Sequence, residues 1–195
     1  MRITGGSRLG LQIDVPSGLD VRPTPDKVRQ AIFNSLGTRV EHARVLELFA
    51  GSGALSLESL SRGALNALCI EKSEKHARFI RDNARRANLA PGVLDARVQD
   101  AFTALAQLAA EPRQFDLILA DPPYGEKNVG RRSTSFAQQM FDDLHLPALL
   151  APGGLWVLGH TKRDTLELTA AWNETRQLKH GDTIIRFLQR ASAAE

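Results

Sequence analysis

The sequence has little cysteine, and this scarcity excludes several kinds of site. Cys69 is the single cysteine among 195 residues, so no internal disulfide can form and the chain suits a reducing compartment. One thiol and five histidines without metal-ligand spacing do not build a zinc site, so we expect no metal. No pattern typical of a serine or cysteine triad is present, so we expect no covalent intermediate.

Long apolar runs are also missing. No run approaches the roughly 20 apolar residues that cross a bilayer, which argues against membrane association. The N-terminal segment carries Arg2 but no apolar stretch, which argues against a signal peptide. We therefore expect a cytoplasmic protein. Hydrophobic residues make up 43% of the chain and charged residues 24%, which is typical of one globular domain with a sizeable core.

Positive charge is concentrated near the N-terminus. The net charge is +3. Residues 1–39 contain six arginines and lysines and three aspartates, and six minus three gives the same excess of +3. This distribution favours a polyanionic partner, with a solvated surface as the alternative interpretation.

The first forty residues predict a small appendage. Residues 1–21 alternate apolar and polar positions around Gly5-Gly6, which indicates a β-hairpin or arm. Thr24-Pro25-Asp26 then predicts the start of a helix that Thr24 caps and Gly37 ends. We expect residues 1–40 to form a basic appendage that docks the polyanionic partner and residues 41–195 to form the main domain.

From residue 44 onward the chain alternates between strand and helix patterns. Apolar strands are predicted at 44–49, 66–71, 94–98, 115–120 and 154–159, and helices at 54–63, 73–88, 101–110 and 136–150. Strands at 172–179 and 183–189 then predict an antiparallel hairpin. The expected fold class is α/β, a Rossmann-like, seven-stranded, mostly parallel sheet with a C-terminal antiparallel hairpin.

A glycine turn after the first of these strands predicts a cofactor site. A full dinucleotide fingerprint needs a third glycine, and Ser56 stands in its place. Glu47, just before the turn, would repel a pyrophosphate but could accept hydrogen bonds from the ammonium group of a methionine moiety. The pattern therefore favours S-adenosylmethionine over a dinucleotide. The predicted contacts in this segment are Glu47, Phe49, Gly51, Ser52 and Gly53.

Two further strands end in acidic residues. Glu71 follows Gly53 by 18 residues (71 minus 53), the spacing at which a carboxylate binds a ribose diol. Asp100 follows the third strand, where it could accept from an adenine amino group, cap the next helix, or do both. We expect Glu71, Lys72, Asp100 and Ala101 to contact the cofactor.

The fourth strand leads into the most informative motif, Asp121-Pro122-Pro123-Tyr124. Consecutive prolines fix the backbone and remove two N–H donors, so the loop presents carbonyl oxygens. The carboxylate of Asp121 and the carbonyl of Pro122 could hold both hydrogens of an aromatic amine, whose nitrogen is a poor nucleophile until it is oriented. Tyr124 could stack on the base. These four residues are the predicted catalytic group.

Several motifs along the chain together resemble a known family. They are Arg2-Ile3-x-Gly5-Gly6, Arg22-Pro23-Thr24-x-Asp26-x-Val28-Arg29-x-x-x-Phe33-Asn34, Phe49-Ala50-Gly51-Ser52-Gly53-Ala54-Leu55, Leu60-Ser61-Arg62-Gly63-Ala64, Asp121-Pro122-Pro123-Tyr124 and Gly181-Asp182-Thr183. The chain resembles the bacterial 16S ribosomal RNA guanine-N2 methyltransferases of the small-subunit type. The resemblance implies that Glu71 and Asp100 hold S-adenosylmethionine, which leaves as S-adenosylhomocysteine, and that residues 121–124 hold the guanine.

The resemblance also implies a partner, 16S rRNA in the assembling small ribosomal subunit, and no obligate protein partner is evident. A polar loop at 125–135 could close over a base flipped into the site. The candidate phosphate contacts are Arg2, Arg8, Arg22, Lys27, Arg29, Lys127, Arg131 and Arg132.

Four alternative functions remain open. A DNA base amino-methyltransferase uses a similar tetrapeptide but usually carries a target-recognition region, for which this chain has no room. Methylation of a protein glutamine poses the same chemical problem. A nucleotide-dependent oxidoreductase is disfavoured by Ser56 and by the tetrapeptide. A non-catalytic RNA-binding assembly factor could keep the same fold.

Overall fold

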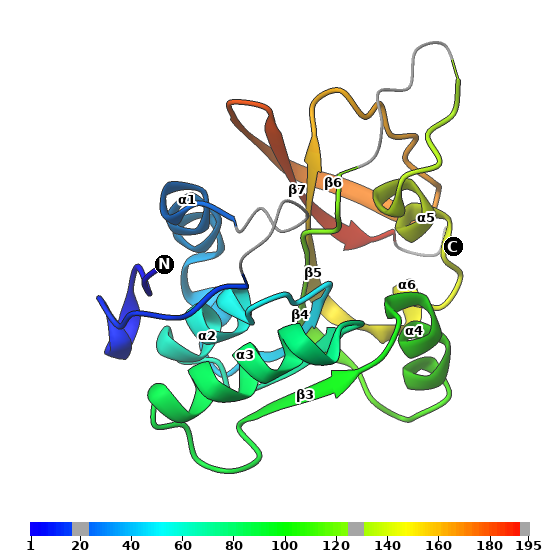
Figure 1. Ribbon diagram of the computed structural model, residues 1–195. Helices are drawn as coiled ribbons and strands as arrows, with labels where there is room; N and C mark the ends of the chain where they lie inside the picture. The colour runs from blue at the N-terminus through cyan, green and yellow to red at the C-terminus, as the bar shows by residue number, and fades with distance from the viewer. Residues whose placement is uncertain (17–23, 125–130, 192–195) are drawn as a thin grey trace.

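The computed structural model describes residues 1–16, 24–124 and 131–191. Seven strands form one sheet in the order β3-β2-β1-β4-β5-β7-β6 (Figure 1). The strands are β1 (Arg44–Leu48), β2 (Asn66–Glu71), β3 (Leu94–Val98), β4 (Phe115–Ala120), β5 (Leu150–Thr161), β6 (Trp172–His180) and β7 (Thr183–Arg190). The helices are α1 (Asp26–Leu36), α2 (Ala54–Ser61), α3 (Glu74–Arg86), α4 (Ala101–Ala109), α5 (Phe136–Asp142) and α6 (Leu146–Leu149), with short 3-10 turns at Gly6–Arg8 and Gly37–Val40.

The sheet confirms the predicted mixed topology. Strands β1 to β5 pair in parallel, and β7 pairs antiparallel with both β5 and β6. The chain runs outward from β1 to β3 and then returns to place β4 on the other side of β1. The carboxyl ends of β1 and β4 therefore lie side by side at the point where the strand order reverses, which is where open α/β sheets bind ligands.

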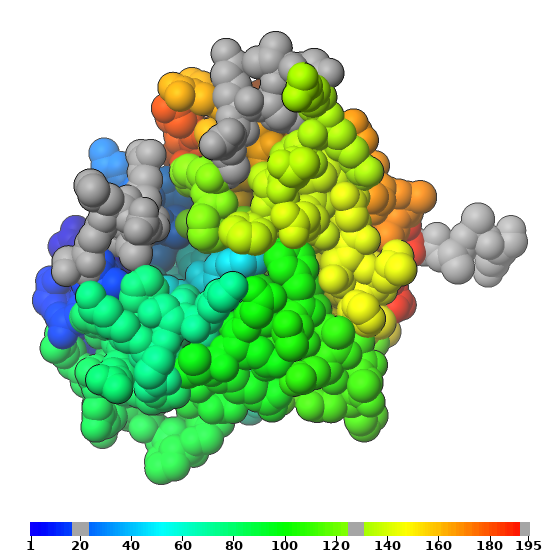
Figure 2. All heavy atoms as spheres, turned by 45° about the vertical axis from the view of Figure 1, so that its right-hand side comes forward, coloured from blue at the N-terminus to red at the C-terminus, as the bar shows by residue number. Residues whose placement is uncertain are grey.

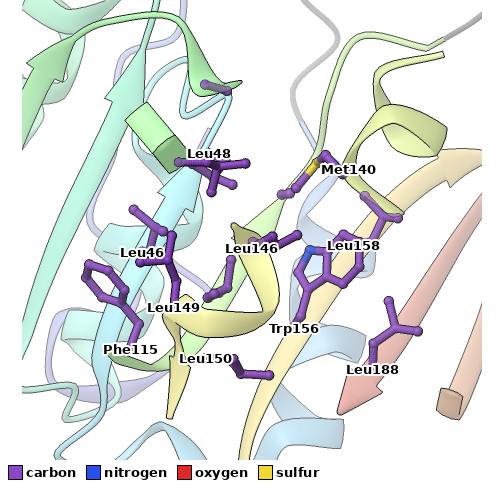
Figure 3. Packing of buried hydrophobic residues seen from close by; sticks show 14 of the residues in the cluster. Leu46, Leu48, Phe115, Met140, Leu146, Leu149, Leu150, Trp156, Leu158 and Leu188 are labelled. Atoms are coloured by element: carbon purple, nitrogen blue, oxygen red, sulfur yellow. The ribbon is translucent and has the colours of Figure 1, made fainter. Parts of the chain in front are cut away.

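Side chains of successive strand residues cover opposite faces of the sheet. Leu46, Ile118 and Trp156 belong to a buried cluster with helices α4, α5 and α6, part of which Figure 3 shows. Their neighbours Val45 and Leu117 belong to a second cluster, on the face that α1 covers. Because all these strands are buried on both faces, their sequences are continuously apolar instead of alternating.

The N-terminal residues pack onto the same body. Arg2 and Gln12 form an isolated antiparallel bridge, and the Gly6–Arg8 turn lies between them. Ile3 and Ile13 are buried against α2 and against Ala87, which follows α3. A Cβ on Gly6 would stand 1.9 Å from the carbonyl oxygen of Ser61, so this close approach requires glycine. The described residues of this segment, 1–16 and 24–40, share buried contacts with the sheet and its helices, while the role of residues 1–40 as a basic appendage that docks RNA stays a prediction.

Two local predictions are wrong. The helix predicted at 136–150 is split into α5 and α6, because the carboxylate of Asp143 accepts hydrogen bonds from the backbone nitrogens of His145 (2.8 Å) and Leu146 (2.9 Å), a turn that competes with the helix. Thr24 does not cap α1, because Pro25 occupies the N-cap position and no side chain makes a capping bond there. Gly37 ends α1 as predicted, with φ of 56°.

Candidate active site

A cavity of about 640 Å³ opens at the carboxyl edge of the central strands. Figure 2 shows a hollow on this face, with cyan residues of the glycine-turn region at its floor and green to yellow-green residues around it. The predicted site residues that line the cavity are Glu47, Phe49, Gly51, Ser52, Glu71, Lys72, Asp100, Ala101 and residues 121–124. The structure therefore brings the glycine turn, both acidic strand ends and the tetrapeptide to one cavity.

The glycine turn adopts a backbone that few residues tolerate. Phe49, Gly51 and Gly53 have φ values of 57°, 55° and 74°. Nothing lies within 4 Å of the position of a Cβ on Gly51, so this turn faces open space. Gly53 does not line the cavity. It begins α2 and packs against Ile80, whose side chain would lie 3.0 Å from an added Cβ. Its role is therefore to shape the turn.

Glu71 holds the turn in place. Its carboxylate accepts hydrogen bonds from the backbone nitrogens of Gly51 (2.7 Å) and Ser73 (2.8 Å). A carboxylate offers about four acceptor positions, so these two bonds leave capacity for the hydroxyl groups of a ribose. Its predicted contact with the cofactor is compatible with this geometry and stays a prediction.

Glu47 lies beneath the turn and stabilises the start of α2. The N-cap residue of this helix is Gly53, which has no side chain to bond the first amides. The carboxylate of Glu47 accepts from the backbone nitrogens of Ser56 (2.8 Å) and Leu55 (3.3 Å) instead. Burial raises the pKa of Glu47 to about 7, against the opposing effect of these hydrogen bonds. Its predicted contact with an ammonium group remains untested.

Of the two roles that the sequence left open for Asp100, the structure confirms the helix cap. Its Oδ1 accepts from the backbone nitrogens of Phe102 (3.0 Å) and Thr103 (3.3 Å), so it caps α4. Its Oδ2 lies 3.4 Å from the ammonium of Lys72, which is largely exposed. Contact of Asp100 with an adenine stays a prediction.

An aromatic wall completes this side of the cavity. The rings of Phe49, Phe102 and Phe136 have centroids 5.6 to 6.2 Å apart. Phe136 lines the cavity and was not predicted as a site residue, nor were His76 and Gln99, which also line it. The sequence offers only one signal for Phe136, an apolar residue at the predicted start of a helix. In the structure 40% of its surface is exposed, which is unusual for a phenylalanine and fits a position in a cavity wall.

The tetrapeptide is held by residues far away in the sequence. The hydroxyl of Thr24 donates to Oδ2 of Asp121 at 2.6 Å, across 97 residues. The hydroxyl groups of Tyr124 and Thr183 share a hydrogen bond of 3.0 Å, which ties the tetrapeptide to β7. Pro122 is buried, whereas Pro123 and Tyr124 are exposed. Asp121 and Tyr124 both line the cavity.

The structure corrects the prediction that Arg29 contacts phosphate. Its side chain is fully buried, and its guanidinium donates to the carbonyl oxygens of Thr24 (2.8 Å) and Arg2 and to the carboxylate of Asp26 (2.9 Å). A buried group with these partners is not available to RNA. The apolar neighbours of Arg29 in α1 gave no signal of this burial, because an arginine on a helix is usually exposed.

Arg8 is exposed enough to reach solvent, but it lies away from the cavity. Its Nε donates to the carbonyl oxygen of Ala87 (2.8 Å), just beyond the C-terminal end of α3. The cavity lies at the other end of this helix, beside Ser73 and His76, and thirteen helical residues span about 20 Å. A contact between Arg8 and RNA would therefore lie well outside the site and stays a prediction.

Six other candidates for RNA contact also stay predictions. Arg2, Lys27, Arg131 and Arg132 are exposed. Arg132 forms ion pairs with Asp142 (2.7 Å) and Glu167 (3.1 Å), which a phosphate would have to replace. Arg22 and Lys127 lie outside the described residues. Among the residues that the structure describes, no group of three or more His, Cys, Asp or Glu side chains could hold a metal ion, and no helix could span a membrane.

Comparison with known proteins identifies the family. Residues 1–189 match the family of Conserved hypothetical protein 95. The chain belongs to this family. One relative is the Ribosomal RNA small subunit methyltransferase D of Escherichia coli. It is 32% identical to this chain, over all of this chain and 92% of its own length. YlbH of Bacillus subtilis is 36% identical over 66% of this chain and 70% of its own.

Solved structures show the same fold. The structure of yhhF from Escherichia coli matches this member of the Conserved hypothetical protein 95 family with a TM-score of 0.77 and 29% identity, over 99% of each chain. A 16S rRNA N2 methyltransferase of Thermus thermophilus, RsmC, was solved with AdoMet and guanosine. It matches with a TM-score of 0.68 and 25% identity, over 91% of this chain and 45% of its own. The fold is that of the Rossmann-like methyltransferases.

Proposed function

We propose that this chain transfers a methyl group from S-adenosylmethionine to the exocyclic N2 of a guanine in 16S rRNA. The observation that carries the proposal is the single cavity that joins the glycine turn and Glu71 to the carboxylate of Asp121. A full-length relative is named for methylation of small-subunit ribosomal RNA, and a structural neighbour is named for N2 methylation of 16S rRNA, which supports the substrate class.

The cavity suits S-adenosylmethionine in size and chemistry. Its volume of about 640 Å³ is within the range of about 300 to 1,000 Å³ of small-molecule sites. The carboxylates of Glu71 and Asp100 line the cavity and supply acceptors for a ribose and an adenine, and Phe49 and Phe136 offer apolar surface to a ring. When bound, the cofactor supplies an activated methyl group.

The residues of the chain then need only to bind and orient the amine. The amino nitrogen of guanine is a weak nucleophile, because its lone pair is delocalised into the ring. Acceptance of its two hydrogens by the Asp121 carboxylate and the Pro122 carbonyl would turn that lone pair toward the methyl group. Stacking on Tyr124 contributes roughly 1–3 kcal/mol. Asp121 need not be a strong base, since proton loss can follow methyl transfer.

The finer parts of the proposal concern the partner. The substrate is taken to be the assembling small ribosomal subunit, in which folded RNA supplies contacts beyond the exposed Arg2, Lys27 and Arg131. Few phosphate contacts predict weak binding to free RNA with a marked dependence on salt.

Mapping of base methylation tests this function directly. We expect one guanine of 16S rRNA to lack its N2 methyl group in cells without this protein, and complementation to restore it. An unchanged methylation map would refute the proposal. A thermal-shift measurement tests the cofactor separately. S-adenosylhomocysteine should stabilise the protein and NAD(H) should not, because a ligand that binds only the folded state raises its stability.

A further inference from the structure

The hydrogen bond between Thr24 and Asp121 links the N-terminal segment to the proposed reaction centre. Thr24 stands directly before α1, lines the cavity, and donates its hydroxyl hydrogen to Oδ2 of Asp121 at 2.6 Å. A bond this short to a carboxylate is strong, because one partner is charged. The hydroxyl makes no capping bond to α1, so this contact is not a by-product of helix formation.

Thr24 is itself held by a buried arginine. Nη1 of Arg29 donates to the carbonyl oxygen of Thr24 at 2.8 Å. The guanidinium also pairs with Asp26 at 2.9 Å and lies 3.8 Å from the carboxylate of Glu58, and the side chains of Arg29 and Glu58 are fully buried. Glu58 belongs to α2, the helix that begins at the glycine turn. The position of Thr24 is therefore fixed relative to the cofactor side of the cavity.

The other oxygen of Asp121 is confined by β5. A Cβ on Gly159 would stand 2.6 Å from Oδ1 of Asp121, so the carboxylate lies where any larger residue at position 159 would place an atom. The backbone of Gly159 does not have a positive φ, so its conformation does not require glycine. The absence of a side chain matters instead, because it leaves room for the Asp121 carboxylate. The hydroxyl of Thr24 on one side and the bare backbone of Gly159 on the other select one orientation of the carboxylate.

We propose that Thr24 is a positioning residue, whose hydroxyl fixes the plane of the Asp121 carboxylate in the orientation that meets an amino group. This inference rests on the proposed function and adds the N-terminal segment to the machinery of the reaction. The χ2 torsion of aspartate is broad, so a carboxylate without such a bond samples many orientations. Orientation of an acceptor matters because a small misplacement of reacting groups costs rate steeply.

The kinetic test compares Thr24→Val, which keeps the shape and removes the donor, with Thr24→Ser, which keeps the donor. The substrates are S-adenosylmethionine labelled in the methyl group and small ribosomal subunits from cells lacking this protein. We expect Thr24→Val to lower kcat about tenfold or more, the effect of losing a hydrogen bond to a charged group. The KM for S-adenosylmethionine should stay within about twofold, and Thr24→Ser should recover most of kcat.

Two further variants separate positioning from damage to the fold. Thr38→Val alters an exposed threonine beyond α1 and should behave as the wild type. Gly159→Ala should lower kcat without changing the KM for S-adenosylmethionine, because it displaces Asp121 from the opposite side. A Thr24→Val enzyme that is as fast as the wild type, or faster because its hydroxyl had competed with the amine, overturns the inference.

Crystal structures of the cofactor-free variants give a readout that does not depend on activity. We expect the Asp121 carboxylate to rotate or to split between conformers in Thr24→Val and to keep its orientation in Thr24→Ser. If the wild type methylates no ribosomal RNA, the proposed function fails, and the torsion of Asp121 still decides the inference. If the wild type is active and Asp121 is unmoved in Thr24→Val, the inference alone fails.

Discussion

The two sides of the cavity are assembled in different ways. All of the predicted cofactor contacts come from one stretch of chain, residues 47–101, in which Gly51, Glu71 and Asp100 lie at the ends of neighbouring strands, and Phe136 of α5 is the one distant residue that we add to this side. The target side joins Thr24 to Asp121 across 97 residues and Tyr124 to Thr183 across 59 residues. The cofactor side is therefore a product of local β–α units, and the target side depends on the packing of the whole chain.

The largest effect should come from Asp121→Ala, which removes the target side and leaves the cofactor side intact. We expect kcat to fall about 100- to 1000-fold, the loss seen when one oriented hydrogen-bonding group is removed from a reaction centre. Calorimetry should show a Kd for S-adenosylhomocysteine within about twofold of wild type. Asp116→Ala is the matched control, since Asp116 lies at the opposite end of β4 and pairs with Arg44. Equal kcat for both variants would contradict the role of Asp121.

A second prediction concerns the pH dependence of stability, to which one buried group on each side of the cavity contributes. The pKa of Glu47 is raised by burial to about 7, so its contribution to the free energy of unfolding declines as pH rises from 4.5 to 7. The pKa of His160, on β5 beside the target side, is lowered to about 4, mainly by burial and also by Arg186. The contribution of neutral His160 to the free energy of unfolding is present above pH 6.5 and is lost as pH falls toward 4. The two dependences have opposite signs and similar size.

Single variants should uncover each dependence. Relative to wild type, Glu47→Gln should gain up to about 3 kcal/mol of unfolding free energy between pH 4.5 and 7, since one pKa unit corresponds to about 1.4 kcal/mol. His160→Gln should instead lose less stability than wild type as pH falls. Urea denaturation of the cofactor-free protein at several pH values measures both. Variant curves parallel to that of the wild type would show that neither group titrates as the structure indicates.

A smaller effect should follow from Glu71→Gln, which perturbs the cofactor side alone. Glutamine has one acceptor oxygen, so it can keep the bond from Gly51 or from Ser73 but not both, and it loses the charge that strengthens hydrogen bonds to ribose hydroxyls. We expect the Kd for S-adenosylhomocysteine to rise about tenfold, consistent with hydrogen bonds to a charged group. The kcat at saturating cofactor should be retained. Glu74→Gln, on the exposed first turn of α3, serves as control. An unchanged Kd in Glu71→Gln would remove Glu71 from the cofactor site.

The smallest effect concerns the bond between Tyr124 and Thr183. Tyr124→Phe keeps the ring for stacking and removes the hydroxyl, so kcat/KM should fall only about threefold, the typical worth of one neutral hydrogen bond. Thr183→Val should have a similar effect. The double variant should be no worse than either single variant if the two hydroxyl groups act on each other. Additive losses would show that each group has a separate role.

The contrast between the two sides also explains what the sequence could predict. The strand and helix alternation, the glycine turn and the acidic residues at two strand ends follow from local patterns, and the structure places Gly51, Glu71 and Asp100 at one cavity. The local pattern Thr24-Pro25-Asp26 favours a helix cap for Thr24. Its actual partner, Asp121, is 97 residues away, and no local pattern encodes that contact.

Burial was the other property that local patterns missed. Arg29 sits in a basic segment, and charge alone suggested an exposed phosphate contact. The structure shows that Arg29 is fully buried beside the buried Glu58 of α2 and pairs with the partly exposed Asp26, because α1 turns this face onto α2. The break between α5 and α6 was missed for a related reason, since an apolar run looks continuous until the side chain of Asp143 binds the backbone.

The position of β7 in the sheet has a consequence for how newly made chains mature. β7 lies between β5 and β6, although it follows both in the sequence. While the ribosome is still synthesising residues 183–190, β5 has an unpaired edge that attracts other strands, and β6 has no neighbour. The cofactor side can therefore assemble on a nascent chain before Thr183 arrives to anchor Tyr124, so methyl-transfer competence would be the last property that the molecule acquires.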